Sequence, residues 1–165
     1  MCIRDSHGEA FGEHGTNAHA RTVYEEAVHV PFFFYLPGLE PQQLETQVSL
    51  VDVGPTVLDL FDLPTPGFWM GQSLLPVVAG KADRLERPIA IDTGRHVQAL
   101  CLDDGRKVIF NRPQHTTEVF DLKQDPQELT NLAASGQPRI DEVIQIGEFF
   151  FGRIRRSAEL PQISD

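Results

Sequence analysis

"SHGEAFGEHGTNAHA", residues 6–20, combines three histidines, His7, His14 and His19, with three glycines and two glutamates. The stretch has few apolar side chains, so it is poorly suited to a core and rich in groups that bind metals or anions. A histidine followed by glycine suits a ligand at the end of a strand, where the chain turns and an ion can approach the backbone. Imidazole favours zinc, manganese, iron or copper, and oxygen ligands favour calcium or magnesium. The spacing of the histidines alone leaves a metal site, an anion site and a solvated loop open.

Composition sets limits on the partners of the chain. Its 165 residues are 41% hydrophobic and 23% charged, which is typical of a globular protein with room for one core. The formal net charge of −10 argues against a nucleic-acid surface, because phosphates are bound by clustered Lys and Arg. No apolar run is long enough to predict a membrane span. Two cysteines, Cys2 and Cys101, do not form a disulfide framework and leave the compartment open.

The first half of the chain predicts one strand and two helices. "HVPFFFYLPG", residues 29–38, is typical of a buried strand that ends in a Pro-Gly turn. "SLVDVGPTVLDLFDLPTP", residues 49–66, has helical spacing, with Asp52 as a candidate N-cap and Pro55 in the first turn. "GQSLLPVVAG", residues 71–80, predicts a second short helix.

The second half predicts an antiparallel sheet and a helix. Strand-like runs occur within 87–94, 96–112 and 116–122, and the middle run is expected to be a hairpin with a two-residue primed turn at Asp104-Gly105. A helix is expected from about Pro138 to Leu160. Its apolar face contains Ile140, Val143, Ile144, Gly147, Phe151 and Ile154, and we expect Phe149 and Phe150 to widen it.

The two halves of the chain are predicted to contain different kinds of structure. A parallel-type strand within 32–36 needs neighbouring strands and covering helices, which this chain alone does not supply. We therefore expect an α/β fold, in which the chain is the back end of a larger α/β protein plus a small α+β subdomain.

Five motifs occur in an order that resembles the sulfatase branch of the alkaline-phosphatase-like superfamily. They are "SHGEAFGEHG", "YEEAVHVPFFFYLPG", "VSLVDVGPTVLDLFDLPTP", "GQSLLPVVAG" and "TTEVFDLKQDPQELTNLA". The resemblance implies that residues 7–85 are the C-terminal part of an alkaline-phosphatase-like sandwich. It also implies that residues 86–165 are a small α+β subdomain made of an antiparallel sheet and a C-terminal helix.

The same resemblance implies two site residues. His7 matches the histidine of an Asp-His metal pair, and His19 matches a position at which the family has a His or Lys that contacts the sulfate or phosphate group. The implied cofactor is a divalent metal ion, calcium ahead of manganese or zinc. The implied substrate is a small-molecule or carbohydrate sulfate ester. We expect structural roles for Glu9, Glu13, His14, Tyr24 and Glu25, and a position at the surface or at the rim of the site for His29.

The chain departs from the family pattern at two points. Ser6 stands where the family has a metal-binding aspartate, and Asp5, one position away, would point to the other face of a strand. The Cys/Ser-x-Pro-x-Arg motif that carries the formylglycine nucleophile is absent, since neither Cys2 nor Cys101 has that context. We therefore expect a C-terminal fragment of a sulfatase that is inactive alone, with residues 1–6 as a non-native leader.

Two alternatives stay open at this point. One is a fragment of a phosphodiesterase or phosphoethanolamine-type transferase of the same superfamily, which uses Thr or Ser as the nucleophile. The other is a non-catalytic binding module built on the C-terminal subdomain.

Overall fold

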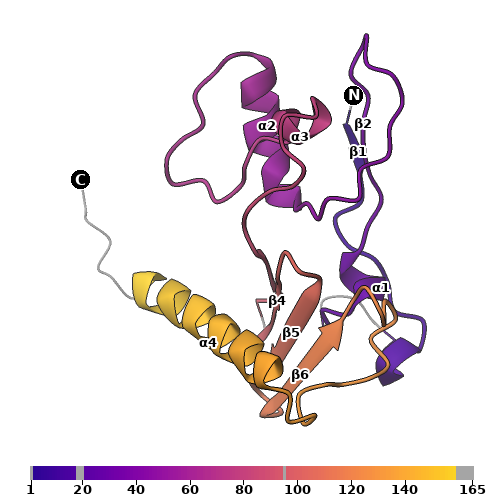
Figure 1. Cartoon of the computed structure of the whole chain (residues 1–165), viewed down its shortest axis with the longest axis vertical. Coiled ribbons are helices and arrows are strands. Elements are labelled where there is room, and N and C mark those ends of the chain that lie inside the picture. Colours follow the sequence, from indigo (N-terminus) through magenta and orange to yellow (C-terminus); the bar gives the residue numbers. More distant parts are fainter. Residues whose placement is uncertain (1, 18–20, 95, 159–165) are drawn as a thin grey trace.

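The computed structural model describes residues 2–17, 21–94 and 96–158. The first half of the chain contains short elements joined by long loops, and the second half contains a four-stranded sheet with a long helix across it (Figure 1). The strands are β1 (Cys2–Arg4), β2 (Phe32–Phe34), β3 (Ile89–Asp92), β4 (Val97–Cys101), β5 (Arg106–Asn111) and β6 (Thr116–Asp121). The α-helices are α1 (Glu25–Val28), α2 (Val53–Leu60), α3 (Leu75–Val78) and α4 (Pro138–Ala158), and two 3-10 helices are η1 (Glu13–Gly15) and η2 (Leu50–Asp52).

The second half is an antiparallel meander. The strand order is β3-β4-β5-β6, and every neighbouring pair is antiparallel, with Val108 opposite both Leu100 and Val119. The antiparallel sheet with a C-terminal helix that the sequence predicts is confirmed. The division into residues 7–85 and 86–165 stays a prediction.

The turn between β4 and β5 differs from the predicted one. The Leu102 N–H donates to the Arg106 carbonyl over 2.8 Å, and the Gly105 N–H donates to the Leu102 carbonyl over 3.1 Å. Residues 103–105 therefore form a three-residue loop in which Gly105 alone has a positive φ, of 92°. The hairpin was predicted correctly, but its two-residue primed turn was wrong, because the glycine serves the left-handed last position of a longer loop.

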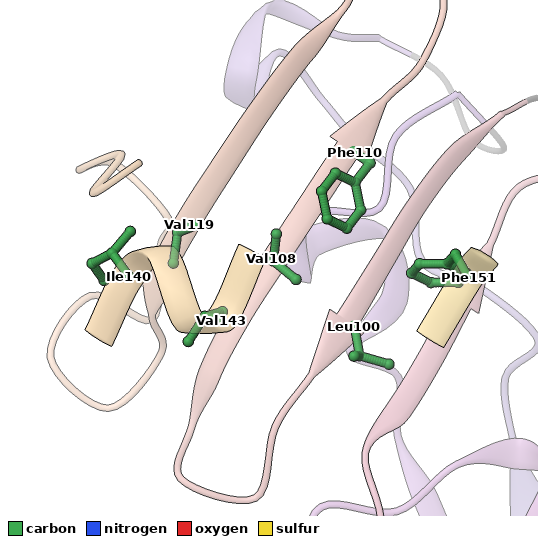
Figure 2. Close-up of a cluster of buried hydrophobic side chains, with 7 residues drawn as sticks. All are labelled: Leu100, Val108, Phe110, Val119, Ile140, Val143 and Phe151. Carbon is green, nitrogen blue, oxygen red and sulfur yellow. The ribbon is translucent and has the colours of Figure 1, made fainter. Parts of the chain in front are cut away.

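One face of the sheet packs against α4. Leu100, Val108, Phe110 and Val119 point toward the helix, which contributes Ile140, Val143 and Phe151 (Figure 2). All seven side chains are buried. Phe150 is partly buried against this cluster, whereas Phe149 is 62% exposed, so the predicted widening of the apolar face by Phe149 is wrong. At 100° per residue, Phe149 lies about 160° around the helix from both Gly147 and Phe151, on the solvent side.

The strand predicted within 29–38 forms, but it is not buried. β2 pairs antiparallel with β1, with Phe33 opposite Ile3, and Phe33 is 62% exposed. The expected parallel type of strand is wrong, because within the described part of the chain β2 has one partner strand and that pairing is antiparallel. Its partial exposure agrees with the expectation that this chain alone cannot bury it on both faces. None of the described helices is long and apolar enough to cross a membrane.

Asp52 connects the two halves of the chain. Its carboxylate is fully buried and accepts from the Ser49 N–H over 2.8 Å and the Gln72 N–H over 2.9 Å. The Arg87 guanidinium, just before β3, donates to both carboxylate oxygens. Asp52 was predicted to cap α2, and the helix does begin at the next residue, but the carboxylate turns away to bind these groups instead.

The helix α4 provides a matched pair of glycines that tests its packing. A Cβ at Gly147 would lie 2.7 Å from Phe110 and 2.9 Å from Val108, whereas one at Gly152 would meet nothing within 4 Å. We expect Gly147→Ala to lower the free energy of unfolding by about 1–3 kcal/mol through overpacking. Gly152→Ala should raise it by about 0.5–1 kcal/mol through helix propensity. Thermal unfolding of both variants checks this, and equal effects would contradict the close helix–sheet contact.

Candidate functional site

The segment that carries the candidate site residues lies against the other face of the sheet. Val23 is buried there with Val97, Ala99, Ile109 and Phe120, and Tyr24 and Val28 are partly buried beside them. Because alternate side chains of a strand point to opposite faces, the sheet is covered by α4 on one side and by residues 22–28 on the other. The N-terminal segment is therefore held in place by packing against the four-stranded sheet.

A buried ion-pair cluster fixes this segment to the sheet. The Lys107 ammonium on β5 has no exposed surface and lies 2.8 Å from Glu25 Oε1 and 2.9 Å from Glu128 Oε1. The second carboxylate oxygen of Glu128 accepts the Glu25 N–H over 2.6 Å. Three elements that are distant in the sequence, α1, β5 and the loop after β6, thus meet at one ammonium group.

Burial and charge act in opposite directions on this cluster. Burial disfavours the Lys107 ammonium, but the Glu128 and Glu25 carboxylates outweigh it and raise the pKa of Lys107. Burial raises the pKa of Glu128, although Lys107 opposes that change. A buried pair of this kind adds little net stability as a whole, but it makes the loss of either partner costly.

His14 makes a second connection between the same parts. Its Nδ1 lies 3.0 Å from Glu26 Oε1, and its Nε2 lies 3.1 Å from the carbonyl oxygen of Glu128. The ring stacks on Tyr24 with 3.8 Å between centroids, and the Tyr24 hydroxyl donates to Glu118 over 2.7 Å. The structural roles predicted for His14, Tyr24 and Glu25 are confirmed by these contacts.

Two further predicted roles are confirmed. The Phe11 N–H donates to Glu13 Oε2, and such backbone hydrogen bonds lower the pKa of Glu13. The His29 side chain is 79% exposed and lies 3.4 Å from Glu25, which agrees with the predicted surface position.

The Asp-Pro-Gln-Glu-Leu-Thr-Asn segment, 125–131, orders the loop that supplies Glu128. The Asp125 carboxylate accepts the N–H groups of Leu129 and Thr130, and Asn131 Oδ1 accepts those of Val119 and Ala133. Glu128 itself has a φ of 55°, a left-handed conformation that is unfavourable for a residue with a Cβ. The loop thus holds Glu128 in a strained conformation from which its carbonyl and carboxylate reach the N-terminal segment.

His7 lies in the loop between β1 and η1. Its Nδ1 is 2.8 Å from the Gly8 carbonyl oxygen. A Cβ at Gly8 would lie 2.1 Å from the Glu26 carbonyl oxygen, so glycine is required there for contact with α1. The described residues contain no group of three or more His, Cys, Asp or Glu side chains that could hold a metal. They therefore do not fit a metal site by themselves, and the metal-binding role of His7 stays a prediction.

His19 lies outside the described residues. The described residues on either side, Asn17 and Arg21, line a cavity of about 480 Å³ between this segment and β4–β6. The other lining residues are His14, Gly15, Thr16, Thr22, Tyr24, Val97, Ile109, Asn111, Gln114 and Glu118. This lining of amides, hydroxyls and charged groups can form hydrogen bonds with hydroxyl and anionic groups of a ligand.

Most of the chain matches a known protein family. The model of the family described as "N-sulphoglucosamine sulphohydrolase, C-terminal" matches residues 12–146, which include the His14–Glu128 contact and the Lys107 cluster. The chain belongs to this sulfatase family. The predicted family and fold class are confirmed.

Two curated relatives of this sulfatase-family chain are sulfatases. It is 36% identical over 147 residues to Arylsulfatase K of Gallus gallus, which covers 81% of this chain and 27% of the relative. It is 30% identical over 145 residues to the Delta 4,5-hexuronate-2-O-sulfatase of Bacteroides thetaiotaomicron, and this match covers 81% of this chain and 30% of the relative. The chain thus spans between a quarter and a third of the length of these relatives.

Solved structures place the sulfatase-family chain in the same fold. The structure of a 2-O GAG sulfatase matches with a TM-score of 0.73 and 25% identity over 96% of this chain and 36% of that one. A phosphonate monoester hydrolase from Silicibacter pomeroyi matches with a TM-score of 0.70 and 21% identity over 99% and 37%. The latter likeness shows the fold alone.

Lys107 is the structural residue that the sequence reasoning missed. In "RKVIFN", 106–111, it directly precedes the apolar run 108–110, and strand alternation places it on the same face as Ile109. A lysine at an inward-facing strand position is a signal for a buried carboxylate partner.

Removal of the Lys107 ammonium should unfold the site. We expect Lys107→Met to lower the free energy of unfolding by about 3–5 kcal/mol, because Glu25 and Glu128 would be left buried without their counter-charge. The exposed Lys81 serves as a control, and Lys81→Met should change stability by less than about 0.5 kcal/mol. Denaturant unfolding measures both, and a Lys107→Met variant as stable as Lys81→Met would contradict the role of the cluster.

Proposed function

We propose that this chain acts as part of a sulfatase that hydrolyses sulfate esters of sugars. The observation that supports this most directly is the family match over residues 12–146, together with 36% and 30% identity to two sulfatases. In this reaction the sulfate ester reacts with water, the S–O bond to the sugar breaks, and a free hydroxyl and inorganic sulfate are released. The names of the hexuronate and GAG sulfatases support an anionic sugar as the substrate class.

The proposed roles follow the resemblance residue by residue. His19 would contact the sulfate group, where a cationic donor stabilises the negative charge that develops during S–O cleavage. His7 would be one ligand of a divalent metal, which is the family's cofactor, with calcium ahead of manganese or zinc. The remaining ligands and the nucleophile would come from residues outside this chain, so the 165-residue chain would be inactive by itself.

The cavity lined by Asn17 and Arg21 supports an extended substrate. Arg21 provides a cation, and Asn17, Asn111 and Gln114 provide amide groups around a space of about 480 Å³. Amide side chains hydrogen bond to sugar hydroxyls, and a guanidinium binds sulfate or carboxylate groups. We therefore place a sugar neighbouring the reactive sulfate in this cavity.

The phosphodiesterase alternative shares this fold, because the phosphonate monoester hydrolase structure matches it, but that likeness shows the fold alone. That structure has lower identity to this chain than the two sulfatases, at 21% against 36% and 30%. The sulfatase assignment is favoured for this reason.

Activity of a longer enzyme that includes residues 7–165 tests the assignment. With an aryl sulfate as substrate, His19→Ala should lower kcat/KM by about 10²- to 10³-fold, the typical effect of losing one charge-stabilising donor. The exposed His115 provides the control, since His115→Ala should leave kcat/KM unchanged. The isolated 165-residue chain should show no turnover above a His7→Ala, His19→Ala double variant. Faster hydrolysis of a phosphate diester than of the sulfate ester would contradict the sulfatase assignment.

Substitution of Arg21 tests the proposed place of the neighbouring sugar. In the same enzyme, Arg21→Gln should raise KM for a sulfated disaccharide by about tenfold, as expected for losing one charged hydrogen bond of about 1.5 kcal/mol. It should leave KM for a small aryl sulfate unchanged, because that substrate does not reach the cavity. Equal effects on both substrates would place the neighbouring sugar elsewhere.

A further inference from the structure

We propose that His14 is a doubly protonated imidazolium at neutral pH, and that in this form it is a positioning residue for the 12–17 turn, which precedes His19 in the chain. The charge state follows from the geometry alone, and the positioning role rests on the proposed function. His14 is not among the residues to which the sulfatase resemblance assigns a part in the chemistry.

Both ring nitrogens of His14 face acceptors. Nδ1 lies 3.0 Å from a carboxylate oxygen of Glu26, and Nε2 lies 3.1 Å from the backbone carbonyl oxygen of Glu128. A carboxylate oxygen and a carbonyl oxygen accept hydrogen bonds, and a neutral imidazole can donate from one nitrogen only. Both hydrogen bonds can therefore exist together only when the ring carries two protons and a positive charge.

The surroundings of the ring favour that charge. One face of His14 stacks on Tyr24, and a cation on an aromatic face is stabilised by the ring quadrupole. The Glu26 and Glu128 carboxylates act directly on the ring and favour its charged form. Of the other charged groups on the elements packed nearby, Lys107 pairs with Glu25 and Glu128, Glu118 accepts from Tyr24, and Arg21 lines the same cavity as His14. Glu13 precedes His14 in the chain and adds a further carboxylate. The carboxylates that act on the ring make a positive charge on His14 favourable.

The pKa of His14 agrees with the geometry. Burial acts against the charged ring, but the hydrogen bonds from His14 to Glu26 and to the Glu128 carbonyl outweigh it and raise the pKa above its ordinary value. A group whose pKa is raised in the folded state stabilises that state fully below its unfolded pKa, which is about 6.5 for histidine. This stabilisation is lost as the pH rises through the higher pKa of folded His14.

The charged His14 ring affects the neighbouring part of the chain because its two hydrogen bonds hold the 12–17 turn in place. His14 has a φ of 48°, an unfavourable conformation that its contacts must maintain. The turn around it is closed by the Gly12 N–H, which donates to the Thr16 carbonyl over 3.1 Å. On the other side of residues 18–20, Thr22 and Val23 are buried. The described residues on both sides of positions 18–20 are thus anchored, and His14 provides one of the two anchors.

Loss of the second proton should release that anchor. One of the two hydrogen bonds must then break, because the neutral ring presents a lone pair to a carboxylate or a carbonyl. We therefore expect the 12–17 turn to hold firmly at acidic and neutral pH and to loosen at alkaline pH.

Nuclear magnetic resonance of the 165-residue chain tests the charge state. Two ring N–H signals are expected for His14 at pH 7.5, and the exposed His115 serves as the comparison. Glu26→Gln, which keeps a similar shape and removes the charge, should shift the His14 titration to lower pH, whereas His115→Gln should not. A single ring N–H on His14 at pH 7, or a titration unchanged by Glu26→Gln, would overturn the proposal.

The pH profile of the longer enzyme tests the positioning role. With a sulfate ester as substrate, Glu26→Gln should move the alkaline limb of kcat/KM to lower pH, and His115→Gln should leave it in place. An unchanged limb in an active Glu26→Gln enzyme would overturn the positioning role. An enzyme that shows the two ring N–H signals but hydrolyses no sulfate ester would instead contradict the proposed function and support the charge state.

Discussion

The buried Lys107 ammonium is the contact on which the arrangement of this chain depends. It lies on an interior strand of the sheet, and its two carboxylate partners come from α1 and from the loop after β6. An ammonium with no exposed surface requires both partners, because water cannot replace either of them. The position of the N-terminal segment relative to the sheet is therefore set by charge compensation in addition to apolar packing.

This constraint gives a physical reason for motifs that otherwise only identify the family. The tyrosine-glutamate pair supplies Tyr24 and Glu25, and the Asp-Pro-x-Glu segment supplies Glu128. The Gly-Glu-His-Gly loop supplies His14, which joins the other two motifs. Contacts among these residues join the histidine-rich segment to the four-stranded sheet and to the loop after β6. These contacts explain why the three separate motifs occur together.

Local patterns were enough to predict most of the second half. Alternating apolar residues and helical spacing located β3 to β6 and α4, because these elements pack against one another within the chain. The hairpin turn was predicted with the wrong loop length, because a glycine with positive φ serves both two-residue and three-residue loops. Phe149 was predicted to widen the apolar face of α4 because it is aromatic and adjacent to Phe150, but its position around the helix places it on the solvent side. β2 was recognised as a strand, but its exposure depends on which neighbours the chain provides.

The candidate site was less accessible to sequence reasoning. His7 and His19 were found through resemblance, and their chemistry depends on groups that local patterns do not reveal. Lys107 was missed because its partners are separated from it by 82 residues in the case of Glu25, and no short-range pattern joins them. His14 was assigned a structural role correctly, yet its two acceptors became evident only when Glu128, 114 residues later, was brought beside it.

These separations also determine the order in which the chain can acquire its structure during synthesis. Residues 12–28 leave the ribosome first, but the surface that receives them is complete only after residue 128 has been made. The β4–β5 and β5–β6 hairpins form from neighbouring residues and can assemble early, whereas contacts across a hundred residues form slowly. We expect the histidine-rich segment to be the last part to dock, so that during translation it is the region most open to chaperones and proteases.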